Sequence, residues 1–393
     1  MRNLKNINAI SNLPTRIRKY RLLSLIENTR NSDVYVALVP STNQKIIMKI
    51  IPHEKKIGHD ISSESGYILN TNKFASQMES IERECMIHKK VMNHPYVMPI
   101  ADFFDFQNFR VILMPRAFGT LCDFRKKFMN GRPIIGNELS SEQIAKIIAK
   151  IMYRCLKVVQ YLHDDCNILH GDIKPSNIAF DFVQCINSST CSPTSSNPSS
   201  PSNSPPSSPT TRSFNMNNNS NSEFYGNINS GMILELKPLF IDFGHARELS
   251  AKEDFICHCH NMTCEFAAPE VLALEPHGFP SDIFSLGSTF YYLVTGRELL
   301  KQRPSRGSIA SMASEMANVC YNLKNTNAFK EKEWLAFPET LPELIMSMLC
   351  KYQERRPTAL GCLRHPFFEE FLGLPWIRYE DENVPILIER NII

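Results

Sequence analysis

Two short segments carry polar side chains of the kinds that phosphoryl transfer needs. The first, His170-Gly-Asp-Ile-Lys-Pro-Ser-Asn177, places a carboxylate at Asp172, a cation at Lys174 and an amide at its last residue. A carboxylate can orient an attacking hydroxyl, a cation can steady a moving phosphoryl group, and an amide oxygen can bind Mg²⁺. The second, Asp242-Phe-Gly244, adds a carboxylate that can bridge a metal ion to phosphate.

The elements that must position these segments divide the chain into two parts. Strand-like runs lie at 21–26, 34–39, 45–51, 97–104 and 110–114. One helix, predicted over 74–92, interrupts them. A second helix is predicted over 142–163 from its broad apolar face, and the patterns after residue 268 are mostly helical. The pattern predicts an α+β fold with a small β-rich N-terminal lobe and a larger helical C-terminal lobe.

A change of composition separates the two polar segments. Ser, Asn, Pro and Thr make up nearly all of residues 187–222, so this stretch has little to bury and is predicted to be disordered, within an insertion over 187–230. Apolar β-like segments flank it at 177–183 and 232–241. They favour an insertion at the tip of a loop between neighbouring strands, because closing a long loop costs little more than closing a short one. A domain linker is the alternative.

The two polar segments resemble the catalytic loop and the Asp-Phe-Gly element of eukaryotic protein kinases. Further matches follow in the order of that family: Ile46-Ile-Met-Lys49, Ala268-Pro-Glu270, Ser281-Asp-Ile-Phe-Ser-Leu-Gly287, Arg356-Pro357 and His365-Pro-Phe-Phe368. The resemblance covers about residues 20–370 except the insertion. It implies a bilobal kinase fold with an N-terminal flank (1–19), an N-lobe (20–113), a C-lobe (114–370) and a C-terminal tail (371–393).

The resemblance also implies a role for each matched residue. Asp172 and Lys174 would be catalytic, and Asn177 and Asp242 would hold Mg²⁺. Lys49 would bind the α- and β-phosphates of ATP. A helix glutamate would hold Lys49; Glu84 is the first choice and Glu82 is the alternative register.

The same resemblance implies an adenine pocket. Ile47 stands where the family usually has alanine and Ala179 where it usually has leucine, which predicts a compensating swap of volume between the two walls. Leu113 would be the gatekeeper at the back of the pocket. Met114 and Arg116 would supply the hinge hydrogen bonds, because Pro115 lacks an N–H. Ile26 and Val34 complete the predicted nucleotide-binding residues.

Other positions bear on the substrate and on stability. Lys174, and Thr263 seven residues before Glu270, match the family's Ser/Thr-directed members, so the expected substrate is a protein serine or threonine. Glu270 and Arg356 are expected to form a buried ion pair.

Two departures from the family pattern support an alternative. Glu27, Thr29 and Ser32 replace the three glycines of the glycine-rich loop, and Gly171 replaces the arginine before the catalytic aspartate. We expect weaker ATP binding, and activity that depends little on phosphorylation of the activation segment. These departures favour a pseudokinase that acts as a binding module, whereas the retained catalytic groups favour an active enzyme. A small-molecule kinase is a third possibility.

Composition limits the partners. The chain has 43 Lys and Arg against 40 Asp and Glu, a net charge of +3, which argues against a nucleic-acid partner. No long apolar run predicts a membrane span. Scattered cysteines and the lack of a secretory signal predict reduced thiols in the cytoplasm or nucleus.

Cys257-His-Cys-His260 contains residue types that bind zinc but lacks the spacing usual in zinc sites. Four Ser-Pro sites in the insertion, at Ser192, Ser200, Ser204 and Ser208, either are targets of an upstream proline-directed kinase or follow from composition.

Overall fold

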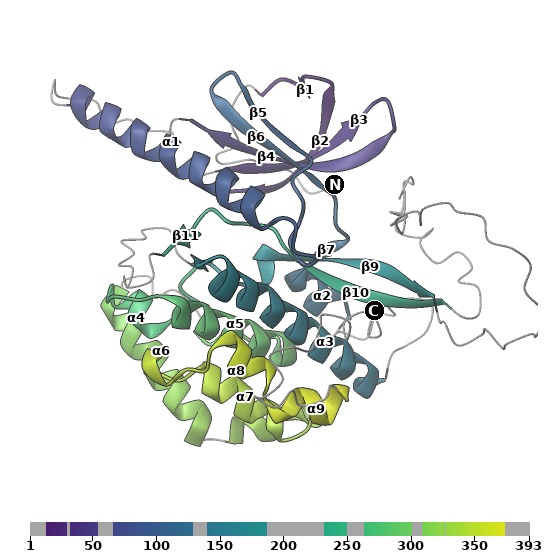
Figure 1. The fold of residues 1–393 in the computed structure, drawn as a ribbon, viewed down its shortest axis with the longest axis vertical. Helices are drawn as coiled ribbons and strands as arrows, with labels where there is room; N and C mark the ends of the chain where they lie inside the picture. The colour runs from purple at the N-terminus through teal and green to yellow at the C-terminus, as the bar shows by residue number, and fades with distance from the viewer. Residues whose placement is uncertain are drawn as a thin grey trace, which may run out of the picture.

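The chain forms a β-rich lobe above a helical lobe, as the sequence predicts (Figure 1). This computed structural model describes residues 13–29, 32–53, 66–128, 140–186, 232–249, 263–300, 309–325 and 327–373. The insertion, the Cys257–His260 segment and most of the C-terminal tail therefore lie outside the described residues. None of the described helices is both long and apolar enough to cross a membrane.

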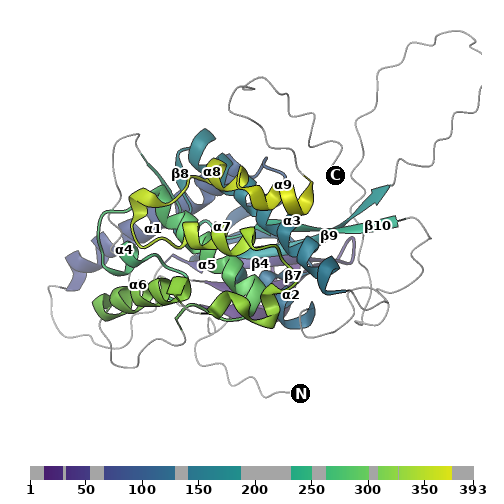
Figure 2. The same cartoon turned by 90° about the horizontal axis from the view of Figure 1, so that it is seen from below.

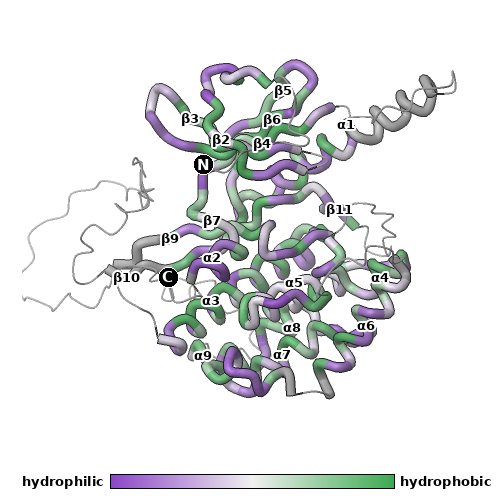
Figure 3. The backbone as a smooth tube through the Cα atoms, turned by 180° about the vertical axis from the view of Figure 1, so that it is seen from behind, coloured by the Kyte–Doolittle hydropathy of each residue, from purple (hydrophilic) through white to green (hydrophobic). Residues whose placement is uncertain are grey.

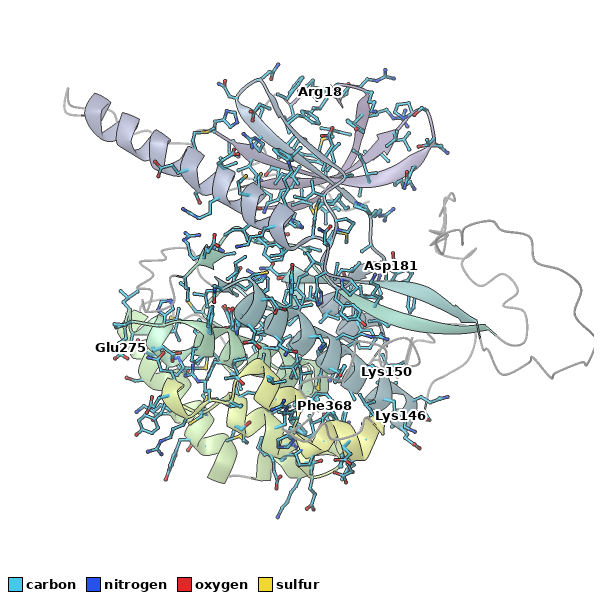
Figure 4. The ribbon with its side chains drawn as sticks, in the orientation of Figure 1. Arg18, Lys146, Lys150, Asp181, Glu275 and Phe368 are labelled. Carbon is cyan, nitrogen blue, oxygen red and sulfur yellow. The ribbon has the colours of Figure 1, made fainter. Side chains whose placement is uncertain are left out.

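The N-lobe is built on one antiparallel six-stranded sheet in the order β1-β2-β3-β4-β6-β5. The strands are β1 (Arg16–Ile17), β2 (Tyr20–Asn28), β3 (Asp33–Val39), β4 (Gln44–Pro52), β5 (Asp102–Phe106) and β6 (Phe109–Pro115). The sheet curls until its two ends meet. Tyr20 stacks on Phe104 with ring centroids 6.5 Å apart, and the Arg18 guanidinium lies 3.6 Å from the centroid of the Phe104 ring. Arg18 lies at the top of the N-lobe sheet (Figure 4). The curl encloses one apolar core.

Two predicted elements of the N-lobe need correction. Helix α1 spans Gly66–Val91 and starts well before the predicted residue 74. Its first turns contain Gly and Asn, which are poor helix formers, so the sequence pattern does not predict them. The predicted strand over 97–104 is wrong in its first half. Val97 makes only a single bridge to Phe240, and Pro99 has no N–H with which to continue a ladder.

The C-lobe is a helical bundle around α3 and α5. Its helices are α2 (Leu121–Phe128), α3 (Ser141–Gln160), α4 (Pro269–Leu272), α5 (Phe279–Thr295), α6 (Ile309–Asn325), α7 (Thr340–Met348), α8 (Ala359–Leu363) and α9 (Pro366–Leu372). Helices α3 and α5 pass through the middle of the lobe (Figure 2). A capping box of Ser140 and Gln143 starts α3. Hydrophobic stretches run along α3 and along the strands of the N-lobe sheet (Figure 3).

A hairpin between the lobes carries the two polar segments. Strand β9 (Ile178–Ile186) pairs with β10 (Met232–Phe240) in register from Phe240↔Ile178 to Met232↔Ile186. The short strand β7 (Gly119–Thr120) pairs with the other edge of β9, and β8 (Ile168–Leu169) pairs with β11 (Arg247–Glu248). The insertion therefore joins two neighbouring antiparallel strands, as the flanking sequence patterns predicted.

Candidate active site

Three charged side chains from three elements meet beneath the N-lobe sheet. The Lys49 ammonium on β4 lies 2.6 Å from Glu84 Oε1 on α1 and 3.0 Å from Asp242 Oδ1, just after β10. The Lys49 and Glu84 side chains are almost entirely buried. Glu84 is therefore the glutamate that holds Lys49. The alternative, Glu82, instead faces Arg110 at 3.0 Å.

The charges of this cluster stabilise one another. Burial works against the charge on Lys49, but Asp242 and Glu84 outweigh it and raise the Lys49 pKa. Burial also opposes ionisation of Asp242, but the neighbouring Lys49 holds the pKa of that carboxyl well below its usual range. The N–H of Gly244 donates to Asp242 Oδ1 at 3.1 Å and favours the same charged form. Asp242 is thus held as a carboxylate.

The catalytic loop forms a second cluster around Asp172. Lys174 Nζ lies 2.6 Å from Asp172 Oδ2 and donates to Thr263 Oγ1, also at 2.6 Å. Asn177 Nδ2 donates to Asp172 Oδ2 and to its backbone carbonyl, both at 2.9 Å. The imidazole of His245, a residue that the sequence analysis did not single out, lies 3.7 Å from the same carboxylate oxygen.

Backbone contacts bring the two clusters together. The N–H of Ile241 donates to the Asn177 carbonyl at 3.1 Å, so Asp242 leaves β10 beside the end of the catalytic loop. From below, Asp282 at the start of α5 accepts the N–H groups of His170 and Gly171 at 2.7 and 2.9 Å. Asp282 is 1 % exposed, so the catalytic loop is anchored on a buried carboxylate.

His163 is an anchor that the sequence analysis missed. Its Nε2 lies 2.9 Å from Asp282 Oδ2, and its ring stacks on Phe279. His163 sits in the π-helical turn Tyr161–Asp165, where the sequence predicts the end of a regular helix. A lone histidine on an apolar helical face gives no signal for such a role.

Gly171 has a backbone reason to be glycine. Its φ is +77°, a left-handed conformation that costs other residues energy, and a Cβ there would lie 3.0 Å from the His245 carbonyl oxygen. We predict that Gly171→Ala lowers the free energy of unfolding by about 1–2 kcal/mol. Urea titration would measure the change. Gly361→Ala is the control, because Gly361 lies in α8 without a positive φ, and it should be neutral or stabilising. Equal stability of G171A and wild type would contradict this account.

The comparisons with known proteins agree with this geometry. The family described as Protein kinase domain matches residues 20–186 and 232–368. The chain belongs to the eukaryotic protein kinase family. It is 23 % identical over 386 residues to calcium/calmodulin-dependent protein kinase type II of Schizosaccharomyces pombe, covering 96 % of this chain and 62 % of that protein. It is 24 % identical over 300 residues to ribosomal protein S6 kinase alpha-3 of Homo sapiens, covering 75 % and 31 %. The kinase chain thus spans less than two thirds of the length of these two relatives.

The register of the sheet corrects the predicted back of the nucleotide site in this kinase. Leu113 pairs with Met48, and both belong to the N-lobe core on the face away from Lys49. Met114 pairs with Ile47, on the same face as Lys49, and packs with Ala179 of β9. The gatekeeper position therefore belongs to Met114. Every residue over 111–114 is apolar, so the sequence alone does not indicate which of these side chains faces the site.

The same one-residue shift moves the predicted hinge of the kinase. Arg116, the predicted donor, is exposed, whereas Ala117 packs against the cluster that contains Met114 and Ala179. We expect the Pro115 carbonyl and the Ala117 N–H to serve as hinge acceptor and donor. Proline is compatible with this position because only its carbonyl is used.

The two remaining predicted nucleotide-binding residues differ in position. Val34 pairs with Lys49 across β3 and β4 and so faces the same side of the sheet. Ile26 lies at a register shift of β2 and is 55 % exposed, and its contact with nucleotide stays a prediction.

Hydrogen bonds join the two described ends of the loop without glycines, Thr29 and Ser32. Thr29 Oγ1 accepts the N–H of Ser32 at 2.9 Å, and the N–H of Thr29 donates to the Ser32 carbonyl at the same distance. Asn28 donates to Asp33 at 2.5 Å. In a glycine-rich loop, backbone N–H groups of this kind point at phosphate. Here the backbone N–H of Ser32 donates to the Thr29 side chain and is therefore not directed at phosphate.

A buried histidine connects α1 to the catalytic elements. The ring of His88 lies 4.8 Å from that of Phe243, which in turn lies 5.2 Å from that of His170. His88 Nε2 is 2.7 Å from the Met98 carbonyl. Burial lowers the pKa of His88 to about 4.

We predict that His88 makes the fold of this chain sensitive to acid. An unfolded histidine takes up a proton near pH 6.5, whereas folded His88 resists protonation down to about pH 4. The contribution of His88 to the free energy of unfolding is therefore fully present above pH 6.5 and is lost as the pH falls from about 6.5 to about 4. Between pH 7.5 and pH 5 the wild type should lose about 2 kcal/mol more than His88→Leu. Urea unfolding at the two pH values measures this difference, and equal losses would refute the prediction.

Proposed function

We propose that this chain is an active serine/threonine protein kinase that transfers the γ-phosphoryl group of ATP to hydroxyl groups of protein substrates. The observation that carries the proposal is the joint assembly of Lys49, Glu84 and Asp242 beside Asp172 and Lys174. These five charged groups form three ion pairs at 2.6 to 3.0 Å, and the Lys49 and Glu84 side chains among them are almost entirely buried.

The residues present suit Mg²⁺. Asn177 uses its amide nitrogen on Asp172, which leaves the carbonyl oxygen as its ligand, and Asp242 is held as a carboxylate. Both are hard oxygen donors of the kind that Mg²⁺ prefers. When bound, the ion would neutralise charge on the phosphates of ATP. Lys49 would hold the α- and β-phosphates while Glu84 fixes its ammonium.

Asp172 would orient the attacking hydroxyl. Within the residues that the structure describes, its contacts with Lys174 and Asn177 fall on Oδ2, so Oδ1 is the oxygen that can accept the hydroxyl proton. Lys174 stands between this carboxylate and Thr263, where it can steady the transferring group. The contact with Thr263 supports the proposed Ser/Thr preference.

A pseudokinase is the second candidate, and the hydrogen bonds between Thr29 and Ser32 favour it. Incubating the full chain with γ-labelled ATP, Mg²⁺ and a generic protein substrate separates the two. We expect EDTA-sensitive label on phosphoserine and phosphothreonine after acid hydrolysis. Binding of nucleotide without transfer would support the pseudokinase, and label on phosphotyrosine alone would refute the Ser/Thr assignment.

A further inference from the structure

Arg110 is an almost buried arginine that the site described above does not use. It lies on β6, on the same face as Ile112 and Met114, and its side chain is only 9 % exposed. Its guanidinium grips Asp105 of β5 through Nε at 2.6 Å and Nη2 at 3.2 Å. The remaining nitrogen, Nη1, donates to Glu82 of α1 at 3.0 Å. Arg110 therefore joins the edge of the sheet to the helix that carries Glu84.

The pairing of Arg110 with Asp105 fixes the direction in which Arg110 can bind α1. A bidentate pair with Asp105 fixes the plane of the guanidinium, so Nη1 has one direction in which to donate. The Cys85 thiol, one helical step from Glu84, lies 3.9 Å from the same nitrogen. A rigid donor on the sheet thus meets α1 at a defined place.

Glu82 and Glu84 grip opposite sides of one helix. Residues two apart on an α-helix are separated by about 200° around its axis and by about 3 Å along it. Ile81 and Cys85 of α1 pack against Ile112 and Met114 of the sheet, and the Glu84–Lys49 pair holds the helix on one side. Apolar packing is non-directional, so these contacts leave α1 some freedom to roll. A second pair on the other side, between Glu82 and Arg110, resists that rotation.

We propose that Arg110 is a positioning residue that sets the rotation of α1 so that the Glu84 carboxylate meets Lys49. This inference rests on the proposed function for its kinetic consequence. Arg110 touches neither of the polar segments. It acts through α1, and its effect on phosphate transfer exists only as long as Glu84 can hold Lys49.

A double-mutant cycle tests this directly. Arg110→Met keeps the apolar stem and removes the fork, and it should lower kcat/KM for ATP about tenfold. Arg110→Lys keeps the positive charge but cannot form the bidentate pair with Asp105. Its kcat/KM for ATP should lie between those of wild type and R110M. In a Glu84→Gln background the effect of R110M should shrink to less than twofold. Lys146→Met, which removes a surface partner of Glu142 on α3, is the matched control and should change nothing. A tenfold loss that persists in the E84Q background would overturn the proposal.

Two further measurements keep the test decisive. If R110M does not fold, Glu82→Gln removes the negative charge of the same bridge from its exposed side. It should cost about threefold, and an undiminished threefold loss with E84Q would again overturn the proposal. Acylation of Lys49 by an amine-reactive reagent, followed by mass spectrometry, does not require phosphate transfer. It should be at least fivefold faster in whichever of the two variants folds than in wild type, and equal rates would refute the role of Arg110. If the wild type transfers no phosphate, the proposed function is wrong. The rate of Lys49 acylation still tests whether Arg110 positions α1.

Discussion

Replacing Asp172 with asparagine is expected to lower phosphate transfer about a thousandfold and to leave the fold intact. The asparagine keeps the shape of the side chain but cannot accept the hydroxyl proton or carry the charge that Lys174 faces at 2.6 Å. In the proposed site, Lys49 and its partners would make the nucleotide contacts, so the affinity for Mg²⁺-ATP should stay within about twofold to threefold of wild type. Initial rates with labelled ATP and equilibrium nucleotide binding measure the two quantities separately.

The companion variant for this prediction is Thr263→Ala. It removes the other partner of Lys174, at 2.6 Å, but leaves Asp172 in place. We expect a smaller loss, about tenfold, because only a neutral contact that positions Lys174 disappears. If D172N retained more than a tenth of the wild-type rate, Asp172 would not orient the hydroxyl, and the assignment of the catalytic loop would be wrong.

Replacing Glu270 with alanine should destabilise the protein by about 3–5 kcal/mol, because it leaves the Arg356 guanidinium buried without its partner. The two side chains form a bidentate pair with distances of 2.5 and 2.7 Å, and both are nearly inaccessible. Arg356 also donates to the backbone carbonyls of Cys350, Lys351 and Pro280. The buried pair thus fastens Ala268-Pro-Glu270, which matches the end of the activation segment in the kinase family, to the loop before α8.

A surface pair gives the control for this second prediction. Glu142→Ala breaks the exposed contact with Lys146 on α3 and should cost no more than about 0.5 kcal/mol. Chemical denaturation of the three proteins compares the free energies. A loss below about 1 kcal/mol for E270A would mean that water or a rearranged side chain compensates Arg356, contrary to the geometry.

The sequence predicts the charged and polar residues of the site, because they stand in motifs of fixed spacing. Lys49, Asp172, Asn177 and Asp242 stand in motifs of fixed spacing, and the structure brings all four together. The buried Glu270–Arg356 pair was also expected and is present.

Other features could not be predicted, for physical reasons. An apolar run such as Val111–Met114 does not show which side chain faces the site, so the gatekeeper was misplaced by one residue. The role of Arg110 depends on Glu82 and Asp105, which are close in space only after the sheet and α1 have packed. The left-handed Gly171 signals strain only once its φ is known.

The β9–β10 hairpin has a practical consequence. The insertion leaves β9 and rejoins β10 at directly opposed residues, Ile186 and Met232, nine ladder pairs from the catalytic loop. The β9–β10 ladder requires only that Ile186 and Met232 lie opposite each other. The chain that connects them can therefore change in length during evolution without disturbing the ladder. By the same reasoning, new chain ends opened there, or a fluorescent reporter spliced in, should leave catalysis untouched.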